Sequence, residues 1–304
     1  MAENPTGRAL PMVQARDLTP DPVFERIGIV GLGLIGGSIA LAARARWPRG
    51  LVIAVDRKDV LEQAMLRHAV DVAADDLSIL AGADLVILAA PVLENVRLLA
   101  ELPRHLAGPA IVTDVSSTKA AIVEAARVLP AGLRFVGGHP MAGAAVGGFG
   151  HARPDLFQNR PWLLTPDATI PPEVVQQLSA FAEGLGSAVS TLTPSEHDRL
   201  LAALSHLPQL TVSALMAVVG AEAGEAGLAL AGRGLVDTTR LASSPADVWR
   251  DIASTNAEQL GRVLDALIAR LTHLRQGLDD GQALEATFEE AARWRAALMK
   301  DRTS

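Results

Sequence analysis

The sequence predicts an α/β domain built on a parallel sheet, followed by an all-α domain. In the first two thirds of the chain, short apolar runs alternate with helix-like stretches, the order that produces parallel strands joined by right-handed crossovers. Strand signals end near Thr193-Pro194, and apolar residues then recur at helical spacing. The 304 residues suit two domains. We place them at residues 26–193 and 194–304, after a lead-in at residues 1–25.

The composition limits the classes of function and of partner. Hydrophobic residues make up 49% of the chain, enough for a sizeable core. The net charge of −7, with no long run of Lys or Arg, argues against a nucleic-acid partner. The absence of cysteine excludes disulfides, thiolate metal sites and cysteine nucleophiles.

Neither the lead-in nor the most apolar stretch predicts a membrane protein. The lead-in contains four prolines and no apolar core of a signal peptide, so we interpret it as disordered and expect a cytoplasmic protein. Residues 200–221 carry no formal charge apart from the titratable His206. Because polar residues interrupt this stretch, we predict a buried helix of a soluble protein and not a membrane span.

A glycine-rich turn follows the first predicted strand, at residues 27–30. The turn reads Gly31-Leu32-Gly33-Leu34-Ile35-Gly36, and a helix and a second strand come after it. Gly31 permits the tight turn, Gly33 lets backbone N–H groups approach a pyrophosphate, and Gly36 lets the helix pack closely on the strand. The helix N-terminus then faces the phosphates. This pattern predicts a Rossmann-type dinucleotide site, and a structural turn in another α/β protein is the alternative. The predicted contacts are Gly31, Gly33, Leu34, Ile35 and Gly36.

Asp56 ends the second strand, where a carboxylate can accept hydrogen bonds from an adenosine ribose. Its charge would repel a 2′-phosphate, which favours NAD over NADP. Arg57 and Lys58 follow directly and weaken this preference, so NADP stays open as the alternative.

Further elements continue the alternation up to the domain boundary. The predicted elements are a helix at residues 60–68, a buried strand at 83–90 ended by Pro91, a helix near 92–106, a strand at 110–114, a helix at about 118–128, and strands at 134–137 and 161–164. Between the last two strands, residues 137–160 are rich in glycine and predict an irregular loop of the kind that borders active sites.

Two stretches of the first domain are candidates for chemistry at the carboxyl ends of the strands. Residues 114–119, Asp-Val-Ser-Ser-Thr-Lys, lie where a strand meets a helix, so Ser117 can serve the site or the serines can simply cap the helix. In Gly137-Gly138-His139-Pro140, the proline confines His139 to extended geometry, and we expect the glycines to let a nicotinamide or substrate approach. His139 can accept a hydroxyl proton while hydride leaves the same carbon. Alternatively, its imidazole only holds the loop.

The helical half adds two histidines and an arginine. His197 and His206 lie on different faces of an ideal helix, so we expect no metal site there. His206 can contact a substrate or be a satisfied core histidine. Arg240 can bind a carboxylate bidentately or form a surface ion pair. Between residues 254 and 276 the apolar residues form one stripe, and this excess predicts an intertwined homodimer.

The chain resembles the prephenate/arogenate dehydrogenase family over residues 26–278. The motifs that carry the resemblance are Gly31-Leu32-Gly33-Leu34-Ile35-Gly36-Gly37-Ser38, residues 114–119, Gly137-Gly138-His139-Pro140-Met141-Ala142-Gly143, Ser205-His206-Leu207-Pro208, and Asp237-Thr238-Thr239-Arg240 followed by Trp249. The resemblance implies a Rossmann domain followed by a helical dimerisation domain. It also implies oxidation of prephenate to 4-hydroxyphenylpyruvate with NAD, or of arogenate to tyrosine, without a metal.

The resemblance also assigns roles to individual residues. It implies that His139 accepts the hydrogen bond of the ring 4-hydroxyl, that Ser117 aligns this hydroxyl, and that His206 contacts the substrate or organises the pocket. Arg240 would hold a substrate carboxylate, and His197 and Trp249 are pocket candidates. In such a dimer, Arg240 and Trp249 can approach the site from the partner subunit.

The sequence departs from the family in the loop after Gly143, where Ala144 and Ala145 stand in place of polar or charged side chains. The choice between prephenate and arogenate therefore stays open. One rival is a β-hydroxyacid-type dehydrogenase, whose families usually rely on a lysine in the helical half, and residues 193–277 contain none. A nonenzymatic dinucleotide sensor is the other rival, and it would not need a positioned base. From the lengths of the two ends, we expect no fused chorismate mutase and no added regulatory domain.

Overall fold

A computed structural model of the chain describes residues 20–143, 146–279 and 281–300. Most of the predicted lead-in therefore lies outside the described residues, as do Ala144 and Ala145. The chain forms two compact units. The N-terminal unit comprises Met1–His197 and Ser244–Asp251, and the C-terminal unit comprises Asp198–Ser243 and Ile252–Ser304.

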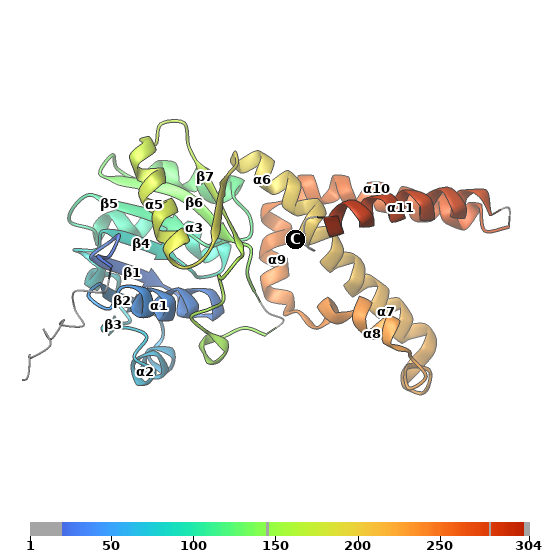
Figure 1. Cartoon of the computed structure of the whole chain (residues 1–304), viewed down its shortest axis with the longest axis horizontal. Helices are drawn as coiled ribbons and strands as arrows, with labels where there is room; N and C mark the ends of the chain where they lie inside the picture. The colour runs from blue at the N-terminus through green and yellow to red at the C-terminus, as the bar shows by residue number, and fades with distance from the viewer. Residues whose placement is uncertain (1–19, 144–145, 280, 301–304) are drawn as a thin grey trace, which may run out of the picture. The chain divides into compact units, whose positions relative to one another are not determined.

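The N-terminal unit is built on an eight-stranded sheet with the order β3-β2-β1-β4-β5-β6-β7-β8 (Figure 1). The strands are β1 (Arg26–Val30), β2 (Leu51–Val55), β3 (Val72–Ala74), β4 (Leu85–Leu88), β5 (Ala110–Asp114), β6 (Leu133–Pro140), β7 (Pro161–Pro166) and β8 (Ala188–Thr191). Strands β1 to β6 are parallel, and β7 pairs antiparallel with β6. This confirms the predicted α/β fold. The strand order reverses between β1 and β4, and this is the point at which such sheets bind ligands.

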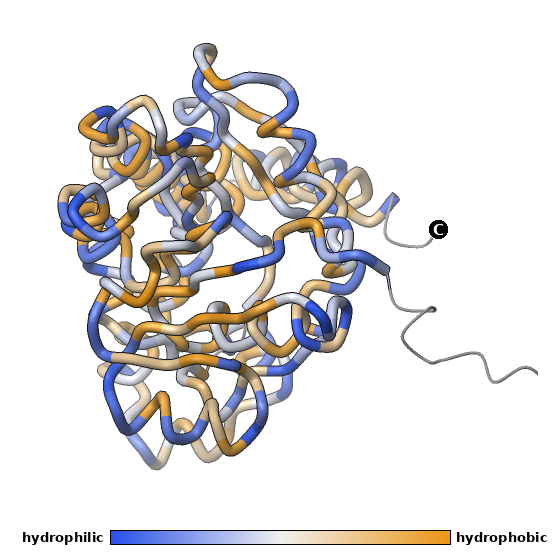
Figure 2. Tube along the Cα trace, turned by 90° about the vertical axis from the view of Figure 1, so that its left-hand side faces the viewer, coloured by the Kyte–Doolittle hydropathy of each residue, from blue (hydrophilic) through white to orange (hydrophobic). Residues whose placement is uncertain are grey.

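Helices cover both faces of the sheet and bury its apolar side chains. The helices are α1 (Leu34–Arg46), α2 (Lys58–Leu66), α3 (Val92–Glu101), α4 (Ala120–Ala125) and α5 (Pro172–Gly184). Successive residues of one strand point to opposite faces, so Ile29 joins the core beneath α1 and α5 while Val30 joins the core beneath α3 and α4. Burial on both faces explains the continuous apolar runs of these strands, which appear orange in Figure 2.

Strand β6 corrects one expectation. The sequence predicts a strand that ends at Gly137 and a loop after it, but residues 138–140 continue the strand as far as Pro140. The cause is antiparallel pairing with β7, which places Gly137 opposite Thr165 and His139 opposite Leu163. Pairing between distant segments leaves no signal in local periodicity. The prediction also missed β3 and β8, which are short and mostly not buried, and α5.

The C-terminal unit contains helices and no strand among its described residues, which confirms the predicted all-α half. Its elements are the second part of α6 (Pro194–Leu201), a π-helical turn (Ala202–His206), α7 (Leu207–Leu228), α8 (Arg233–Thr238), a 3₁₀ turn (Arg240–Ser243), the end of α9 (Ala246–Thr255), α10 (Ala257–Gln276) and α11 (Gln282–Lys300). The buried core is small and comprises Ala202, Leu260 and Val263. Large apolar side chains stay exposed, among them Ile268, Leu271, Phe288 and Trp294.

The predicted burial of residues 200–221 is wrong for the single chain. Within the described residues, the helical stretch Pro194–Leu228 is long and apolar enough to cross a membrane by length and composition. Only 17% of its most apolar window is buried. One such helix is weak evidence for a membrane span, because apolar faces that pack against a partner pass the same test.

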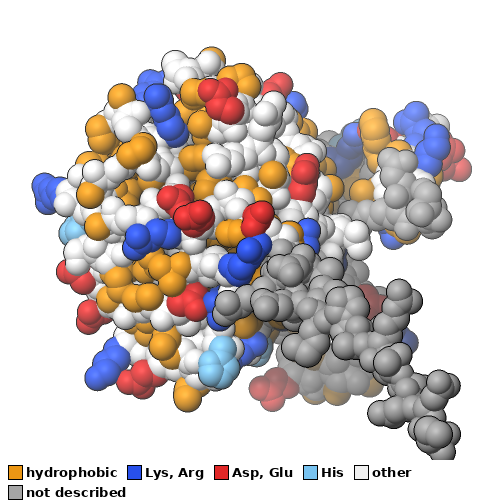
Figure 3. Space-filling model, turned by 60° about the vertical axis from the view of Figure 1, so that its left-hand side comes forward, with side chains coloured by type: hydrophobic (Ala, Val, Ile, Leu, Met, Phe, Trp, Pro, Cys, Tyr) orange, Lys and Arg blue, Asp and Glu red, His pale blue; other side chains and the backbone are white. Residues whose placement is uncertain are grey.

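The surface of the N-terminal unit carries charges of both signs. On the face shown in Figure 3, Lys and Arg side chains alternate with Asp and Glu side chains, with hydrophobic side chains between them.

Candidate functional site

The glycine turn between β1 and α1 has the geometry that a dinucleotide requires. Gly31 has a φ of +95°, and a Cβ there would lie 2.8 Å from backbone atoms of Ala89 and Ala90. A Cβ on Gly36 would lie 1.9 Å from the carbonyl oxygen of Gly31, so α1 packs against the turn without room for a side chain. The space around Gly33, the N-cap of α1, is open. The first N–H groups of α1 therefore face a space that can accept a pyrophosphate.

Asp56 lies beside this turn and fixes it. Its Oδ2 accepts a hydrogen bond of 2.5 Å from the N–H of Leu32, and its Oδ1 accepts one of 2.6 Å from the N–H of Arg57. The half-buried carboxylate is thus held at the carboxyl end of β2, next to the start of α1. Here it can also accept hydrogen bonds from a ribose, because each carboxylate oxygen has two lone pairs.

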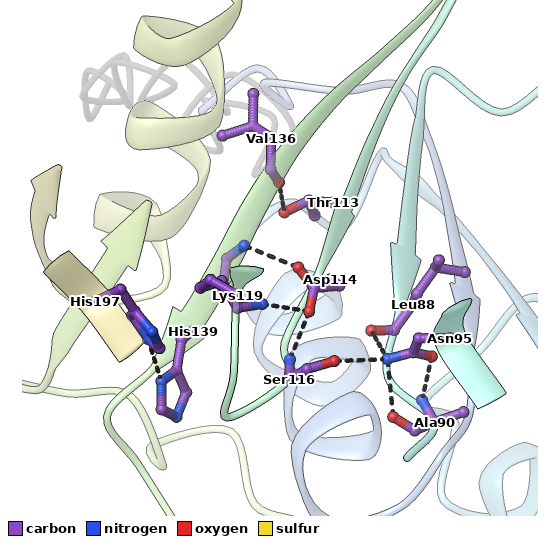
Figure 4. A network of polar contacts seen from close by, with 11 residues as sticks. Leu88, Ala90, Asn95, Thr113, Asp114, Ser116, Lys119, Val136, His139 and His197 are labelled. Atoms are coloured by element: carbon purple, nitrogen blue, oxygen red, sulfur yellow. Dashed lines mark hydrogen bonds and ion pairs between the residues drawn. The ribbon is translucent and has the colours of Figure 1, made fainter. Parts of the chain in front are cut away.

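Asn95 of α3 holds the loop that follows β4 through side-chain hydrogen bonds to its backbone. Its Nδ2 donates to the carbonyl oxygens of Leu88 (3.2 Å) and Ala90 (2.9 Å), and its Oδ1 accepts from the N–H of Ala90 (3.2 Å). The same Nδ2 lies 3.0 Å from Oγ of Ser116, which links this loop to the end of β5 (Figure 4). Sequence reasoning missed Asn95, because nothing local distinguishes it from a solvent-facing helical residue.

His139 lies at the carboxyl end of β6 and is only 9% exposed. Its Nδ1 is 2.9 Å from Nε2 of His197, a fully buried residue of α6 (Figure 4). Because β6 is parallel to β1 and β2 through the intervening strands, His139 and the glycine turn share the same edge of the sheet. The fold thus brings together His139, His197 and the predicted cofactor contacts in one unit.

The two glycines before His139 serve a purpose other than the predicted one. A Cβ on Gly137 would lie 2.3 Å from Oγ1 of Thr165, and a Cβ on Gly138 would lie 2.5 Å from the carbonyl oxygen of Asp114. The protein itself fills this space, so the expectation that the glycines admit a nicotinamide or substrate on that side is wrong. They allow β6 to pass closely over its neighbours.

Beside Gly138 lies a buried ion pair between Asp114 and Lys119, whose side chains are both 0% exposed. Oδ2 of Asp114 also accepts a hydrogen bond of 2.8 Å from the N–H of Ser116. Ser117 is half-buried in the turn that connects these partners. The N-cap of α4 is Lys119, without a side-chain capping bond. The serines therefore do not occupy the N-cap position that the alternative interpretation gave them.

The other predicted residues are arranged as follows. His206 is fully buried at the end of the π-helical turn, and its Nδ1 lies 3.4 Å from Nδ2 of Asn256. Because this π-helical turn lies between His197 and His206, the angle between them that an ideal α-helix predicts does not apply. Single π-helical turns of this kind are frequent at functional sites. Arg240 is exposed and begins a short 3₁₀ turn. Its neighbour Leu241 accepts a hydrogen bond of 2.7 Å from Nε2 of Gln209.

Trp249 is half-buried on α9, in the segment Ser244–Asp251 that groups with the N-terminal unit.

Within the described residues, no group of three or more His, Asp or Glu side chains has a geometry that could hold a metal ion.

Comparison with known proteins gives matches over most of the chain. A family model described as "Prephenate dehydrogenase, nucleotide-binding domain" matches residues 39–191, and one described as "Prephenate dehydrogenase, dimerization domain" matches residues 193–290. A prephenate dehydrogenase of Bacillus subtilis (strain 168) is 34% identical over 282 residues, which cover 90% of this chain and 76% of the relative.

Two solved structures are similar along nearly their whole length. The crystal structure of Synechocystis arogenate dehydrogenase is 34% identical, with a TM-score of 0.75, and the match covers 91% of this chain and 99% of that one. The structure of prephenate dehydrogenase from A. aeolicus, in complex with hydroxyphenyl propionate and NAD+, is 26% identical, with a TM-score of 0.83, and the match covers 90% and 97%.

Proposed function

Because this chain belongs to the prephenate dehydrogenase family, we propose that it catalyses the oxidative decarboxylation of prephenate to 4-hydroxyphenylpyruvate with NAD, a step of tyrosine biosynthesis. The observation that carries this proposal is the position of His139. Its imidazole lies at the carboxyl end of β6, on the sheet edge that also carries the glycine turn, and contacts His197 at 2.9 Å. A base is thus held where a dinucleotide site and a substrate crevice are expected.

The residues around the glycine turn suit NAD. The N–H groups at the start of α1 bind the pyrophosphate, with Gly33 leaving it room, and Asp56 binds the adenosine ribose. NAD, when bound, supplies the acceptor for the hydride that leaves C4 of the substrate ring. The negative charge of Asp56 disfavours the 2′-phosphate of NADP.

His139 removes the proton of the ring 4-hydroxyl. Nδ1 of His139 is shared with Nε2 of His197, so Nε2 of His139 is the atom that accepts this proton. Nε2 carries a lone pair in the neutral ring when Nδ1 holds the hydrogen and donates it to His197. His197 thereby selects the tautomer and stabilises the imidazolium, as the orienting partner of a catalytic histidine does elsewhere.

Removal of the hydroxyl proton starts the movement of electrons in the reaction. As the O–H bond breaks, its electrons form the C4–O double bond while hydride leaves C4. The electrons of the bond between C1 and its carboxylate then enter the ring, carbon dioxide leaves, and the ring oxygen takes up a proton. Aromatisation supplies the driving force. The protein mainly has to align the reactants and provide the base.

The remaining predicted residues bind or align the substrate. Ser117 aligns the 4-hydroxyl with His139, and Arg240 holds a substrate carboxylate through a bidentate contact. His206 contacts the substrate or organises its pocket, and Trp249 is a further pocket residue. The exposure of Arg240 in the single chain leaves its guanidinium accessible to a substrate carboxylate, which supports its role.

Arogenate is the second candidate substrate. It is favoured by the 34% identity to Synechocystis arogenate dehydrogenase. The two substrates share the ring on which the chemistry occurs and differ in the side chain, where arogenate has an amino group in place of the keto group. The purified protein is therefore incubated with each substrate and with NAD or NADP, and reduced nicotinamide is followed. Reduction with prephenate and NAD supports the first proposal, reduction with arogenate alone supports the second, and no reduction with any pair defeats both.

We further propose that the protein is a homodimer that acts in the cytoplasm. The exposed apolar side chains of α10 and α11, including Ile268 and Trp294, support the dimer, because a single chain rarely leaves so much apolar surface uncovered. The match of residues 193–290 to a dimerization domain supports it independently.

A further inference from the structure

We propose that Lys119, paired with Asp114, is a positioning residue that fixes the peptide group leading into His139. This inference rests on the proposed role of His139 as the base. The first observation is that the end of β6 lacks a paired strand on its β5 side. Strands β5 and β6 pair only as far as Thr113 and Val136, because β5 ends at Asp114 while β6 continues to Pro140. The last residues of β6 therefore have a neighbouring strand on one side only.

The ion pair takes the place of the missing strand. The side chains of Asp114 and Lys119 pair beside β6 (Figure 4). Gly138 donates its N–H to Oδ1 of Asp114 at 3.1 Å, and its carbonyl oxygen accepts from Nζ of Lys119 at 2.8 Å. The two side chains thus bind the polar groups of Gly138 as a paired strand would. The carbonyl of Gly138 belongs to the peptide group that continues into the N–H of His139. Lys119 therefore holds the orientation of the backbone from which the imidazole projects.

The buried ion pair between Asp114 and Lys119 has little reason to exist for folding stability alone. Both side chains are fully buried, and the desolvation of two such charges can cancel the attraction between them. Replacing both charges with neutral groups of similar volume is often neutral for stability, whereas removing one partner leaves an unpaired charge. A double substitution can therefore separate positioning from stability.

The ion pair also connects His139 to the cofactor side of the sheet. Asp114 accepts from the N–H of Ser116, and Ser116 contacts Asn95, which holds the loop after β4. Ser117 lies between Ser116 and Lys119, so the same network determines its place. One buried network thus holds the backbone on both sides of the proposed reaction site.

The test uses the full-length double variant Asp114→Asn/Lys119→Met with Thr113→Val as the matched control. Thr113 donates a buried hydrogen bond of 2.7 Å to the carbonyl oxygen of Val136. The control therefore weakens the contact between β5 and β6 and replaces the hydroxyl beside Gly138 with a methyl group, but it keeps both hydrogen bonds that Asp114 and Lys119 make to Gly138. For the double variant we expect kcat to fall at least about tenfold, because small misplacements of a catalytic group are costly. The KM for NAD should stay within about twofold, since the cofactor contacts are unchanged. The control should keep its kcat even if its melting temperature falls equally.

A second readout does not depend on turnover. Hydrogen exchange in the peptide that contains residues 133–141 should accelerate in the double variant relative to the control. The single side-chain oxygen of asparagine cannot accept from both Gly138 and Ser116, and the carbonyl oxygen of Gly138 loses Nζ of Lys119. A wild-type kcat in the folded double variant, or unchanged exchange, overturns the positioning role. An inactive wild-type protein would instead defeat the proposed function, and the exchange result would still decide the structural part. If the double variant does not fold, Lys119→Met replaces it, because a buried carboxyl group left without its partner can take up a proton and become neutral. That variant removes the Nζ donor of the Gly138 carbonyl, and an unchanged kcat in it overturns the proposal in the same way.

Discussion

Nδ1 of His139 and Nε2 of His197 lie 2.9 Å apart and join the end of β6 to α6. The two residues are separated by 58 positions in the sequence, and both rings are buried. Because one nitrogen must donate and the other accept, this contact fixes the tautomers of both rings together. It thereby connects the proposed base to an orienting partner.

The first prediction concerns the base. His139→Asn should lower kcat by about 10²-fold or more, because a positioned base contributes a factor of this size. Binding of NADH, measured by nicotinamide fluorescence, should be nearly unchanged, since the glycine turn and Asp56 are untouched. Comparable turnover in this variant would refute the role of His139.

The second prediction concerns its partner. His197→Gln keeps an acceptor near the position of Nε2, whereas His197→Leu removes it. We expect the leucine variant to lose about tenfold more kcat than the glutamine variant, because orienting contacts strengthen a catalytic histidine. Equal rates in the two variants, with both melting near the wild type, would show that the contact is only structural.

The third prediction concerns the substrate carboxylate. Arg240→Ala should raise the KM for the acid substrate by about tenfold or more, and Arg240→Lys should recover only part of the loss, because lysine lacks the bidentate fork. The exposed Arg295 of α11 provides the matched control. An unchanged KM in the alanine variant would remove Arg240 from the site.

The fourth prediction concerns cofactor choice. Asp56→Asn removes the charge and keeps one oxygen for the N–H of Leu32. The preference for NAD over NADP, measured as the ratio of kcat/KM values, should fall about tenfold, because the repulsion of the 2′-phosphate is lost. An unchanged ratio of kcat/KM values would mean that Asp56 only holds the glycine turn, through its hydrogen bond with Leu32, and does not select the cofactor.

The fifth prediction concerns assembly. Sedimentation velocity should give a mass close to twice 31.8 kDa, because α10 and α11 expose apolar side chains that a second copy can cover. A monomer at micromolar concentration would contradict the dimer.

Local chemistry was sufficient to predict the glycine turn and the strand at residues 110–114. The constraints at Gly31 and Gly36 act between neighbours in sequence, and the apolar run 110–114 is bounded as predicted. The rest depends on contacts between distant segments. Nothing near Lys119 shows that its charge is buried against Gly138, and nothing near His139 shows that β7 extends its strand or that His197 reaches its ring.

The central claim is that His139 accepts the proton of the substrate hydroxyl, and a crystal structure with NAD and a 4-hydroxyphenyl substrate analogue tests it most directly. The account predicts that Nε2 of His139 lies within about 3.2 Å of the ring hydroxyl, the range required of a general base. A ring hydroxyl more than about 5 Å from this imidazole, with the cofactor in place, is beyond hydrogen-bond reach and would contradict it.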